Sequence, residues 1–500
     1  MSRSLLLLLA IPVSGFTQTE CTLDALPDLP DVRYTSVEAV ADPAPHCKAA
    51  GIIGPEIRFE LLLPDNWNGK FVMGGGGGFV GSVQNSALAF GALQSGYATV
   101  GTDTGHQNQG IDASWALDNL ERIVNFGHQA VHRTAVTAKS AISHYYGADI
   151  ERNYFMGCSR GGGQALMEAQ RYPDDFDGIV AGAPAYSWSG IAASGIQIQQ
   201  AMFPDPTNLS AAVVSPAEQA MLEGMILSRC DANDGIEDGI LNDPRQCDFK
   251  VSELPSCSTG DNDECFTPEE KVAISKIYDG PVDPMGQPLF YGHPFGGESD
   301  GAGWSGWLSG GTANSNRNNG SQPIPNAVFG FSTGIMKYLV FHDPDWNYST
   351  YKFENFDNET KILAATLNAT NPDLSAFRDN GGKLLIYHGW SDSALSADAT
   401  IGYYDQVLQH DASASEDVRL YMMPGVLHCA GGKGPSVANF LDVLDQWVES
   451  GVAPDAIVAS YPPASQRTGS RPLCVYPQIA EYDGSGDEFE AANFSCVNPD

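Results

Sequence analysis

The chain has 500 residues, 42% of them hydrophobic and 10% aromatic, so it can bury a sizeable core and is not a disordered polymer. Its 26 Lys and Arg against 61 Asp and Glu leave a formal net charge of −35, which repels nucleic-acid phosphates and anionic membranes, and we expect neither as a partner. The length exceeds one ordinary domain of ~100–200 residues and suits a large α/β enzyme with an insertion.

The first residues have the features of a secretory signal peptide. Arg3 gives a basic start, the apolar run Leu5 to Ile11 follows, and small residues lie at Val13 to Gly15. The run is too short to span a bilayer, so we expect residues 1–19 to be removed from the mature protein. No later segment has ~18 uninterrupted apolar residues, so we expect no membrane anchor and a secreted protein, extracellular or periplasmic.

Strand and helix patterns then alternate along residues 20–185. Short apolar strands are predicted at 57–63, 70–73, 97–100, 153–156 and 178–183, and helices at 120–146 and 164–171. Such alternation is typical of a mostly parallel sheet with helices on both faces. We therefore assign these residues to the first part of an α/β core.

The pattern changes between residues 186 and 375. This stretch is rich in Gly, Asn, Pro and aromatic residues, has weak periodicity, and contains the loop-like segments 296–311 and 314–319. We interpret it as an inserted lid domain. Strands resume at 383–388 and 418–423, with helices near 397–410 and 437–450, so residues 376–500 complete the α/β core.

The strongest catalytic signal is Gly157-Cys158-Ser159-Arg160-Gly161, which matches the pattern G-x-S-x-G. A predicted strand precedes it and a predicted helix follows it. In that context the glycines permit a sharp turn that lifts the serine hydroxyl above the edge of the sheet. A glycine-rich turn with a purely structural role is the alternative. We predict that Ser159 is a nucleophile.

A nucleophilic serine needs a base and a group that orients the base, and in this kind of fold the chain order is Ser, then Asp or Glu, then His. Asp392 follows the first strand after the insertion, and His428 follows the next strand, so we assign both to the triad. Asp398 and Asp405 compete for the acid role but fall in a predicted helix. His388 precedes a turn glycine, and we interpret it as a strand-end residue.

Ten cysteines, an even number behind a predicted signal peptide, indicate disulfides in an oxidising compartment. Spacing suggests four local pairs and leaves two cysteines over: the pairs are Cys21–Cys47, Cys230–Cys247, Cys257–Cys265 and Cys474–Cys496, and the remaining two are Cys158 and Cys429. A bond between the last two would tie the serine turn to the histidine loop. Two free thiols are the alternative, and the whole pairing is a hypothesis, because spacing does not prove connectivity.

The arrangement Cys158-Ser159, Asp392 and His428-Cys429 resembles the tannase and feruloyl esterase family, which includes mono(2-hydroxyethyl) terephthalate hydrolases. The resemblance covers nearly the whole chain after the signal peptide. It implies an α/β-hydrolase fold with a large inserted lid domain, and the same five disulfides. It also implies a secreted serine carboxylesterase that hydrolyses esters of aromatic acids: feruloyl and other hydroxycinnamoyl esters, galloyl esters or terephthaloyl half-esters.

Acyl transfer also needs hydrogen-bond donors for the oxyanion. The backbone N–H of Arg160, directly after the nucleophile, is the first candidate. The second is expected from the run of five glycines after the strand 70–73, and Gly76 and Gly77 are the candidates, because amides without side chains can approach a substrate closely. A tight turn without this role is the alternative. A phosphate-binding loop is not expected, since no G-K-[ST] follows.

An acidic loop in the lid is a candidate cation site. Asp231, Asp234 and Asp238, with two turn glycines between them, can place hard oxygen ligands around one ion. The spacing is not that of an EF-hand. The family resemblance implies a structural Ca²⁺ here, with Ile236 and Ile240 adding backbone carbonyls, whereas a solvated acidic turn is the alternative. We expect its role to be folding of a lid with little core of its own.

The lid also supplies candidates for an acyl pocket, because ligand pockets are largely apolar and aromatic. We select Phe331, Ser332 and Trp304 from the lid, and Leu395 from the loop after Asp392, although an aromatic cluster is more often core than pocket. Family members that hold a terephthalate carboxylate use an arginine in this part of the lid. No arginine occurs between residues 317 and 378, and Arg317 and Lys337 are the only substitutes that we consider.

Several functions share these residues. A small-molecule aromatic ester is the expected substrate, and mono(2-hydroxyethyl) terephthalate hydrolysis is an alternative main or side activity. A catalytically silent binding protein with a hydrolase fold is the non-enzymatic alternative, which the intact Ser–Asp–His order disfavours. A secreted serine peptidase shares the triad and would cleave amides faster than matched esters. The sequence does not predict the oligomeric state.

Overall fold

A nine-stranded sheet forms the core, in the order β1-β2-β3-β5-β4-β6-β7-β10-β11. Its strands are β1 (Val32–Val40), β2 (His46–Ile53), β3 (Ile57–Pro64), β4 (Lys70–Gly74), β5 (Ala98–Thr102), β6 (Arg152–Cys158), β7 (Gly178–Gly182), β10 (Lys383–Gly389) and β11 (Val418–Met423). The computed structural model describes residues 20–258, 264–310, 318–319, 322–463, 465 and 467–499. The predicted signal peptide lies outside these residues.

Most of the sheet is parallel, as the alternation of strands and helices predicts. The pairs that run from β5 through β4, β6, β7 and β10 to β11 are parallel, whereas β1, β2, β3 and β5 pair antiparallel at one end. The carboxyl ends of β6, β10 and β11 therefore meet at one edge, where ligands bind in open α/β sheets. Sequence analysis missed β1 and β2; β1 is an edge strand without a buried residue, so it lacks an apolar pattern.

Helices cover both faces of this sheet, as expected for an α/β hydrolase. The apolar cores place α2 (Ala130–Tyr146), α3 (Arg160–Arg171) and α11 (Ala397–His410) on one face and α12 (Phe440–Ser450) on the other. The helix predicted over 120–146 is not uniform. It consists of α1 (Leu120–Val124), a π-helical turn at Asn125–Gln129, and α2.

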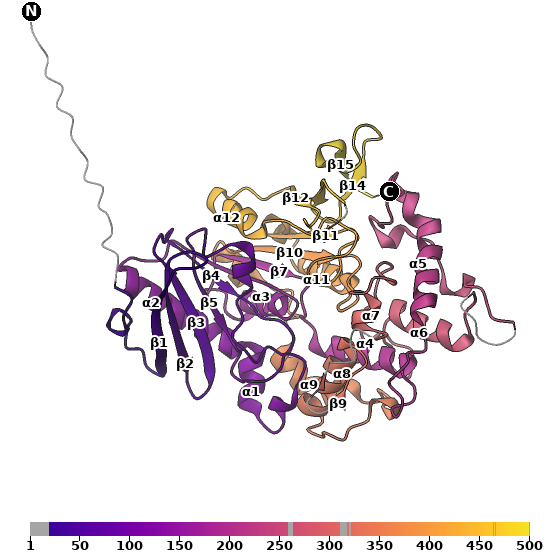
Figure 1. Cartoon of the computed structure of the whole chain (residues 1–500), viewed down its shortest axis with the longest axis horizontal. Coiled ribbons are helices and arrows are strands. Elements are labelled where there is room, and N and C mark those ends of the chain that lie inside the picture. The colour runs from indigo at the N-terminus through magenta and orange to yellow at the C-terminus, as the bar shows by residue number, and fades with distance from the viewer. Residues whose placement is uncertain are drawn as a thin grey trace, which may run out of the picture.

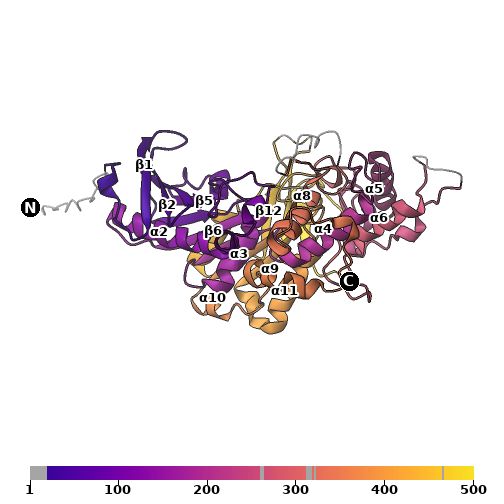
Figure 2. The ribbon, with the colours of Figure 1, turned by 90° about the horizontal axis from the view of Figure 1, so that it is seen from below.

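The lid is more ordered than its sequence predicts. Its described residues form α4 (Trp188–Met202), α5 (Pro216–Cys230), α6 (Pro268–Tyr278), α7 (Trp304–Trp307), α8 (Ala327–Gly334) and α9 (Phe356–Leu367). These helices share one apolar core with buried residues of the first part of the chain, among them Phe79, Trp115 and Phe126. Both α5 and α6 begin with a capping box and a proline in the first turn, at Ser215 and Thr267. These capping signals involve only the few residues at each helix start, so an analysis of apolar periodicity does not detect them. In Figures 1 and 2, α5 and α6 lie at the end of the molecule opposite β1 and β2.

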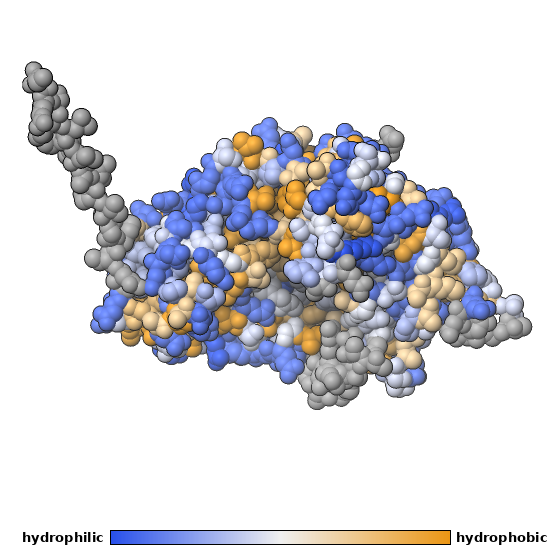
Figure 3. Space-filling view, turned by 45° about the horizontal axis from the view of Figure 1, so that its top comes forward, coloured by the Kyte–Doolittle hydropathy of each residue, from blue (hydrophilic) through white to orange (hydrophobic). Residues whose placement is uncertain are grey.

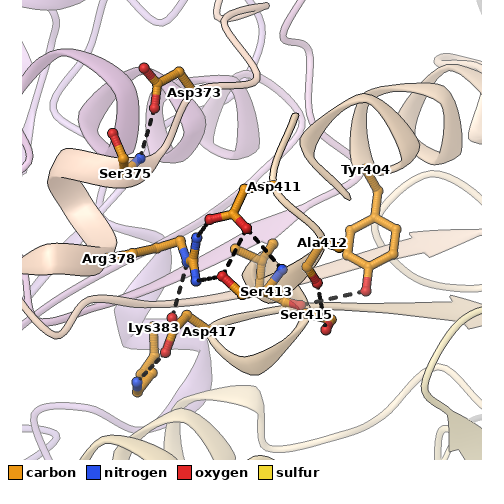
Figure 4. A network of polar contacts seen from close by, with 11 residues as sticks. Asp373, Ser375, Arg378, Lys383, Tyr404, Asp411, Ala412, Ser413, Ser415 and Asp417 are labelled. Carbon is orange, nitrogen blue, oxygen red and sulfur yellow. Dashed lines mark hydrogen bonds and ion pairs between the residues drawn. The ribbon is translucent and has the colours of Figure 1, made fainter. Parts of the chain in front are cut away.

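The chain returns from the lid to the sheet through a network of ion pairs (Figure 4). Arg378, on α10 (Ser375–Asp379), pairs with Asp411 and places its Nε 3.0 Å from Asp417 Oδ2. Lys383, the first residue of β10, pairs with the same Asp417. This network fixes the start of β10 against the start of β11, the two strands that lead to Asp392 and His428.

Two hairpins close the chain: β12 (Ala456–Ser460) pairs with β13 (Ser470–Cys474), and β14 (Ile479–Tyr482) with β15 (Phe494–Val497). The structure contains the five disulfides that the spacing suggests, including the long-range bond between Cys158 and Cys429. Within the described residues, no helix has both the length and the apolar character needed to cross a membrane.

Candidate active site

Ser159 occupies a strained turn between β6 and α3. Its φ is +63°, a left-handed value that is uncommon for residues other than glycine. The turn is tight: a Cβ on Gly157 would lie 2.6 Å from the carbonyl carbon of Gly161. The Ser159 N–H donates to the Gly182 carbonyl (3.0 Å), and its own carbonyl accepts from the Ala185 N–H (2.9 Å). These bonds hold the serine in the conformation expected of a nucleophile elbow.

Asp392 and His428 form the acid–base pair of the site. Asp392 follows β10 and is buried, and its Oδ2 lies 2.7 Å from His428 Nδ1. The other oxygen, Oδ1, accepts from the N–H groups of Ala394 (2.8 Å) and Leu395 (3.0 Å). Burial raises the pKa of the Asp392 carboxyl, but the charge of His428 and hydrogen bonds from His388 and His428 outweigh burial and hold the pKa well below its usual range. The carboxylate therefore stays ionised and orients the imidazole.

One cavity brings Ser159 and His428 together. Both side chains line it, and the rings of His428 and Trp307 lie edge to face with centroids 4.9 Å apart. Within the described residues no hydrogen bond joins Ser159 to His428; such bonds are often long in free enzymes and tighten around substrate. The disulfide between Cys158 and Cys429 links the two catalytic loops directly.

The glycine-rich loop meets the cavity at Gly78, and not at the two glycines that the sequence suggested. The N–H of Gly76 donates to Gln164 Oε1 (3.1 Å), and the N–H of Gly77 donates to Gln84 Oε1 (2.7 Å), so both amides are occupied. Gly78 lines the cavity with Ser159, and in the described part of the chain its N–H has no acceptor. Gly78 is therefore a better candidate for an oxyanion donor than Gly76 or Gly77.

Arg160, the other oxyanion candidate, is anchored by its own side chain. Its buried guanidinium donates to the carbonyls of Phe126 and Gly127, the latter at 3.0 Å, and lies over the Phe126 ring with 4.4 Å to its centroid. Both carbonyls belong to the π-helical turn, where the regular helix bonds are displaced. Burial lowers the pKa of Arg160 to about 9, so the side chain remains charged at neutral pH. This anchor fixes the start of α3 and the backbone N–H after the nucleophile.

The acyl end of the cavity is apolar. Three of the selected residues, Phe331, Ser332 and Leu395, line it, whereas Trp304 does not. Trp304 is only 2% exposed and packs against Tyr278 in the lid core. Trp307, which sequence analysis did not select, lines the cavity instead; both tryptophans lie on α7, and residue type gave no means to choose between them.

The cavity offers little to a charged acyl group. Among the described residues that line it, only Arg160, whose guanidinium points to the π-helical turn, and His428 are ionisable. The Ser332 hydroxyl is fully buried and donates to the Val328 carbonyl (2.7 Å). Among the residues that the structure describes, Lys337 does not line the cavity, and Arg317 lies outside the described residues. Figure 3 shows apolar residues gathered near a hollow in the middle of one face of the molecule.

The three aspartates of the acidic loop lie on one short segment, but among the described residues their carboxylate oxygens do not all lie within 4.8 Å of one another. Asp231 accepts from the Gly239 N–H at both carboxylate oxygens (2.9 Å each), so the loop is curled on itself. Asp238 Oδ2 lies 3.0 Å from the buried guanidinium of Arg471. Burial raises the pKa of Asp234 to about 6, although Arg471 opposes this rise. The donor set is hard oxygen throughout, which fits Ca²⁺ chemistry.

A second acidic group lies under the elbow helix. Among the described residues, His132, Glu168 and Asp175 are the one group of three whose potential metal-ligating atoms all lie within 4.8 Å of one another. Asp175 is already saturated: Oδ1 lies 3.0 Å from Lys139 Nζ and Oδ2 2.6 Å from His132 Nδ1. We interpret this group as a structural ion-pair cluster. Glu168 lies fully buried beside it without a hydrogen-bond donor.

Comparison with known proteins agrees with this geometry. The family model described as tannase and feruloyl esterase matches residues 41–497. The chain is 33% identical to a mono(2-hydroxyethyl) terephthalate hydrolase from Piscinibacter sakaiensis (94% of this chain, 87% of that protein) and 34% identical to a probable feruloyl esterase from Arthroderma benhamiae (87% and 81%). The crystal structure of feruloyl esterase B from Aspergillus oryzae superposes with a TM-score of 0.84 at 26% identity, over 95% of this chain and 99% of that one.

Proposed function

The chain belongs to the tannase and feruloyl esterase family and is a carboxylic ester hydrolase, and we propose that it cleaves esters of neutral aromatic acids through Ser159, His428 and Asp392. One observation carries this proposal. A serine in a strained elbow shares a cavity with a histidine that is hydrogen-bonded to a buried carboxylate. That set of groups, in that chain order, is the one that serine hydrolases use for acyl transfer.

The proposed reaction follows from these positions. Ser159 Oγ attacks the ester carbonyl while His428 Nε2 accepts its proton, and Asp392 stabilises the imidazolium that results. The N–H groups of Arg160 and Gly78 donate to the oxyanion. The imidazolium then protonates the leaving alcohol, and the acyl-enzyme remains. A water molecule, deprotonated by His428, hydrolyses that ester and releases the aromatic acid.

The walls of the cavity favour a neutral acyl group. Trp307, Phe331 and Leu395 provide an apolar surface for an aromatic ring. The described lining residues include no lysine, and the one arginine among them, Arg160, turns its guanidinium to the π-helical turn. A carboxylate buried there without a cation or hydrogen-bond donor would lose its hydration without compensation, which is unfavourable. Hydroxycinnamate esters therefore fit better than the anionic half-ester of terephthalate. The similarity to a terephthalate half-ester hydrolase keeps that activity as the second candidate.

The acidic loop is the proposed site of a structural Ca²⁺. The carboxylates of Asp231, Asp234 and Asp238 and the carbonyls of Ile236 and Ile240 would hold the ion. Support comes from the donor chemistry of the loop and from the burial of Asp234 and Asp238 on a chain of high negative charge. The ion would neutralise these carboxylates and stabilise the lid beside the disulfide Cys230–Cys247.

Secretion is the proposed fate of the protein. Five disulfides support it, because such bonds form and persist in oxidising compartments. The basic start and short apolar run of residues 1–19 point in the same direction.

The decisive experiment is acid release from methyl ferulate, methyl gallate and mono(2-hydroxyethyl) terephthalate, measured in one panel with the parent and the Ser159→Ala variant. We expect turnover of methyl ferulate by the parent and a loss of kcat of about 10⁴–10⁶ in the variant. Ca²⁺ is present throughout and the disulfides are kept oxidised. Should no ester react under these conditions, the esterase proposal fails and a silent binding protein takes its place.

A further inference from the structure

A second histidine contacts the carboxylate of Asp392. His388, on β10, is fully buried, and its Nε2 lies 3.1 Å from Asp392 Oδ2. This is the same oxygen that His428 Nδ1 approaches at 2.7 Å. An ionised carboxylate only accepts hydrogen bonds, so His388 Nε2 carries a hydrogen and donates it.

The ring of His388 is held on its other side as well. Its Nδ1 lies 2.8 Å from the hydroxyl oxygen of Thr400, a fully buried residue of α11. Its Nε2 also lies 3.3 Å from the carbonyl of Leu395. The imidazole is therefore fixed between a strand, a helix and the loop that carries the catalytic acid. Rotation of the ring would break its bonds at both nitrogens.

The hydrogen bonds of Asp392 are divided between its two oxygens. Backbone N–H groups of the 392–395 turn occupy Oδ1, and the two histidines occupy Oδ2. Removal of the inner histidine would leave His428 as the partner of Oδ2 in the described chain. The bonds to Oδ1 and His428 itself would then hold the carboxylate, with one constraint fewer on its orientation. A misplaced carboxylate misplaces the base that it orients, and small displacements of a base are costly in rate.

We propose that His388 is a positioning residue for the hydrolytic reaction, which holds the Asp392 carboxylate in the plane that presents Oδ2 to His428; this inference rests on the proposed function. His388 does not line the acyl cavity among its described residues, so it does not contact the acyl group. Its effect is therefore on the rate of the chemical step and not on substrate binding.

Other titratable groups face the same ring and stay in place when it is replaced. Asp398 of α11 and His293 of the lid interact electrostatically with His388, and His293 Nδ1 lies 3.2 Å from the Asp392 carbonyl. A change of pH profile between the parent and a His388 variant therefore reports the loss of the His388 ring.

The test compares His388→Leu, which has no donor, with His388→Gln, whose side-chain amide can still donate to Asp392. With methyl ferulate as substrate, we expect His388→Leu to lower kcat about tenfold at unchanged KM, and to change the pH profile of kcat/KM. We expect His388→Gln to retain kcat within about threefold of the parent. Thermal unfolding and KM are recorded for each variant.

Three outcomes would overturn the positioning role: parent-like kcat and pH profile in His388→Leu, equal impairment of the Leu and Gln variants, or a rise in KM at constant kcat. Should His388→Leu fail to fold, Thr400→Val removes the hydroxyl that holds the ring without touching Asp392. That variant is expected to lose about threefold in kcat, and parent-like kcat overturns the inference. A parent that hydrolyses no ester defeats the proposed function itself, whereas an active parent with unaffected His388 variants defeats this inference alone.

Discussion

The disulfide between Cys158 and Cys429 joins the residue before Ser159 to the residue after His428. It connects positions 271 residues apart, the end of β6 and the loop after β11. The nucleophile and the base therefore share a covalent frame that does not depend on the lid. Their relative position is set before substrate enters, which is the kind of preorganisation that lowers the barrier of acyl transfer.

Removal of this bond is expected to lower activity more than it disturbs the fold. For the variant Cys158→Ala/Cys429→Ala we expect kcat to fall about 100-fold with KM within about threefold of the parent. The matched control is Cys257→Ala/Cys265→Ala, which removes a lid disulfide that spans eight residues and is expected to leave kcat unchanged. Steady-state kinetics on methyl ferulate and thermal unfolding check both variants. Similar kcat losses in the two variants would contradict the role of the catalytic bond.

The glycine-rich loop permits a sharp test of the oxyanion assignment. A Cβ on Gly78 would lie 2.3 Å from the Gly110 carbonyl oxygen, and its φ is +56°, whereas a Cβ on Gly77 would meet Gln84 Oε1 at an ordinary 3.7 Å. We expect Gly78→Ala to lower kcat 10²- to 10³-fold, on the order of the loss of one oxyanion donor, and Gly77→Ala to stay within about threefold. Measurement of kcat and KM for both variants tests the assignment. A larger loss of kcat in Gly77→Ala than in Gly78→Ala would favour Gly77 as the oxyanion donor.

The sequence predicted most of the sheet, because its strands have local apolar patterns, and it places the proposed catalytic groups directly after three of these strands. The turn at Gly157–Gly161 and the loops after β10 and β11 follow directly from strands with clear apolar runs. The assignments that differ from the structure depend on the direction in which a side chain or an N–H group points, which sequence spacing does not predict. Trp304 and Trp307 lie on one short helix, but only Trp307 lines the cavity. In the glycine-rich loop, Gln84 accepts a hydrogen bond from the N–H of Gly77, whereas Gly78 lines the cavity.

His388 is a second residue whose side-chain contact the sequence did not predict. Its place before a turn glycine reads as the end of a strand, which is correct, and nothing in the sequence reveals that its ring lies against Asp392 four residues later. The lid helices α5 and α6 were missed for a different reason: their start signals at Ser215 and Thr267 are present in the sequence, but the search for periodicity did not use them. Long-range contacts and cap signals thus account for most of the differences.

Calcium binding by the acidic loop predicts a stability effect. Removal of the ion with a chelator should lower the melting temperature. Ca²⁺ at 100 times its Kd should then raise the free energy of unfolding by about 2.7 kcal/mol. Asp234→Asn is expected to abolish this response, whereas Asp248→Asn, which changes an exposed lid carboxylate, should keep it. Thermal scans with Ca²⁺ and with EDTA check the prediction. An equal response of the parent and Asp234→Asn would place the ion elsewhere.

Glu168 predicts a pH dependence of stability. Burial raises the pKa of this carboxyl well above its usual range, so the folded chain binds its proton more tightly than the unfolded chain. This contribution favours the folded state below about pH 4 and is lost as the pH rises toward the folded pKa. Glu168→Gln, which keeps the shape without the charge, is therefore expected to raise the free energy of unfolding at pH 7 by about 1–3 kcal/mol and to change it little at pH 4.

Urea unfolding at both pH values measures this difference. The exposed carboxylate in Glu416→Gln serves as the control and is expected to change stability by less than about 0.5 kcal/mol. A loss of stability in Glu168→Gln at pH 7 would mean that the charged form of Glu168 is favoured in the folded protein, which contradicts the direction of the shift.

The apolar acyl end of the cavity predicts discrimination by charge. Bis(2-hydroxyethyl) terephthalate and mono(2-hydroxyethyl) terephthalate share one ring and one scissile bond, and differ in whether the distal group is neutral or an anion. Because the described lining residues include no lysine and the guanidinium of Arg160 points away, we expect kcat/KM at least about 100-fold higher for the neutral diester. The net charge of −35 repels the anion in the same direction, so the comparison is repeated in high salt, which screens that contribution.

A single substitution tests the cause. Ile335 lines the cavity, so Ile335→Arg is expected to narrow the ratio between the two esters by giving the distal carboxylate a partner, while Ile335→Met, without a charge, leaves it unchanged. Chromatography follows the initial rate for each ester in a separate reaction, because hydrolysis of the diester releases the mono ester, which is the second substrate. Equal kcat/KM for the two esters in the parent would contradict this prediction. It would show that the distal end of the acyl group stays in water, away from the apolar wall.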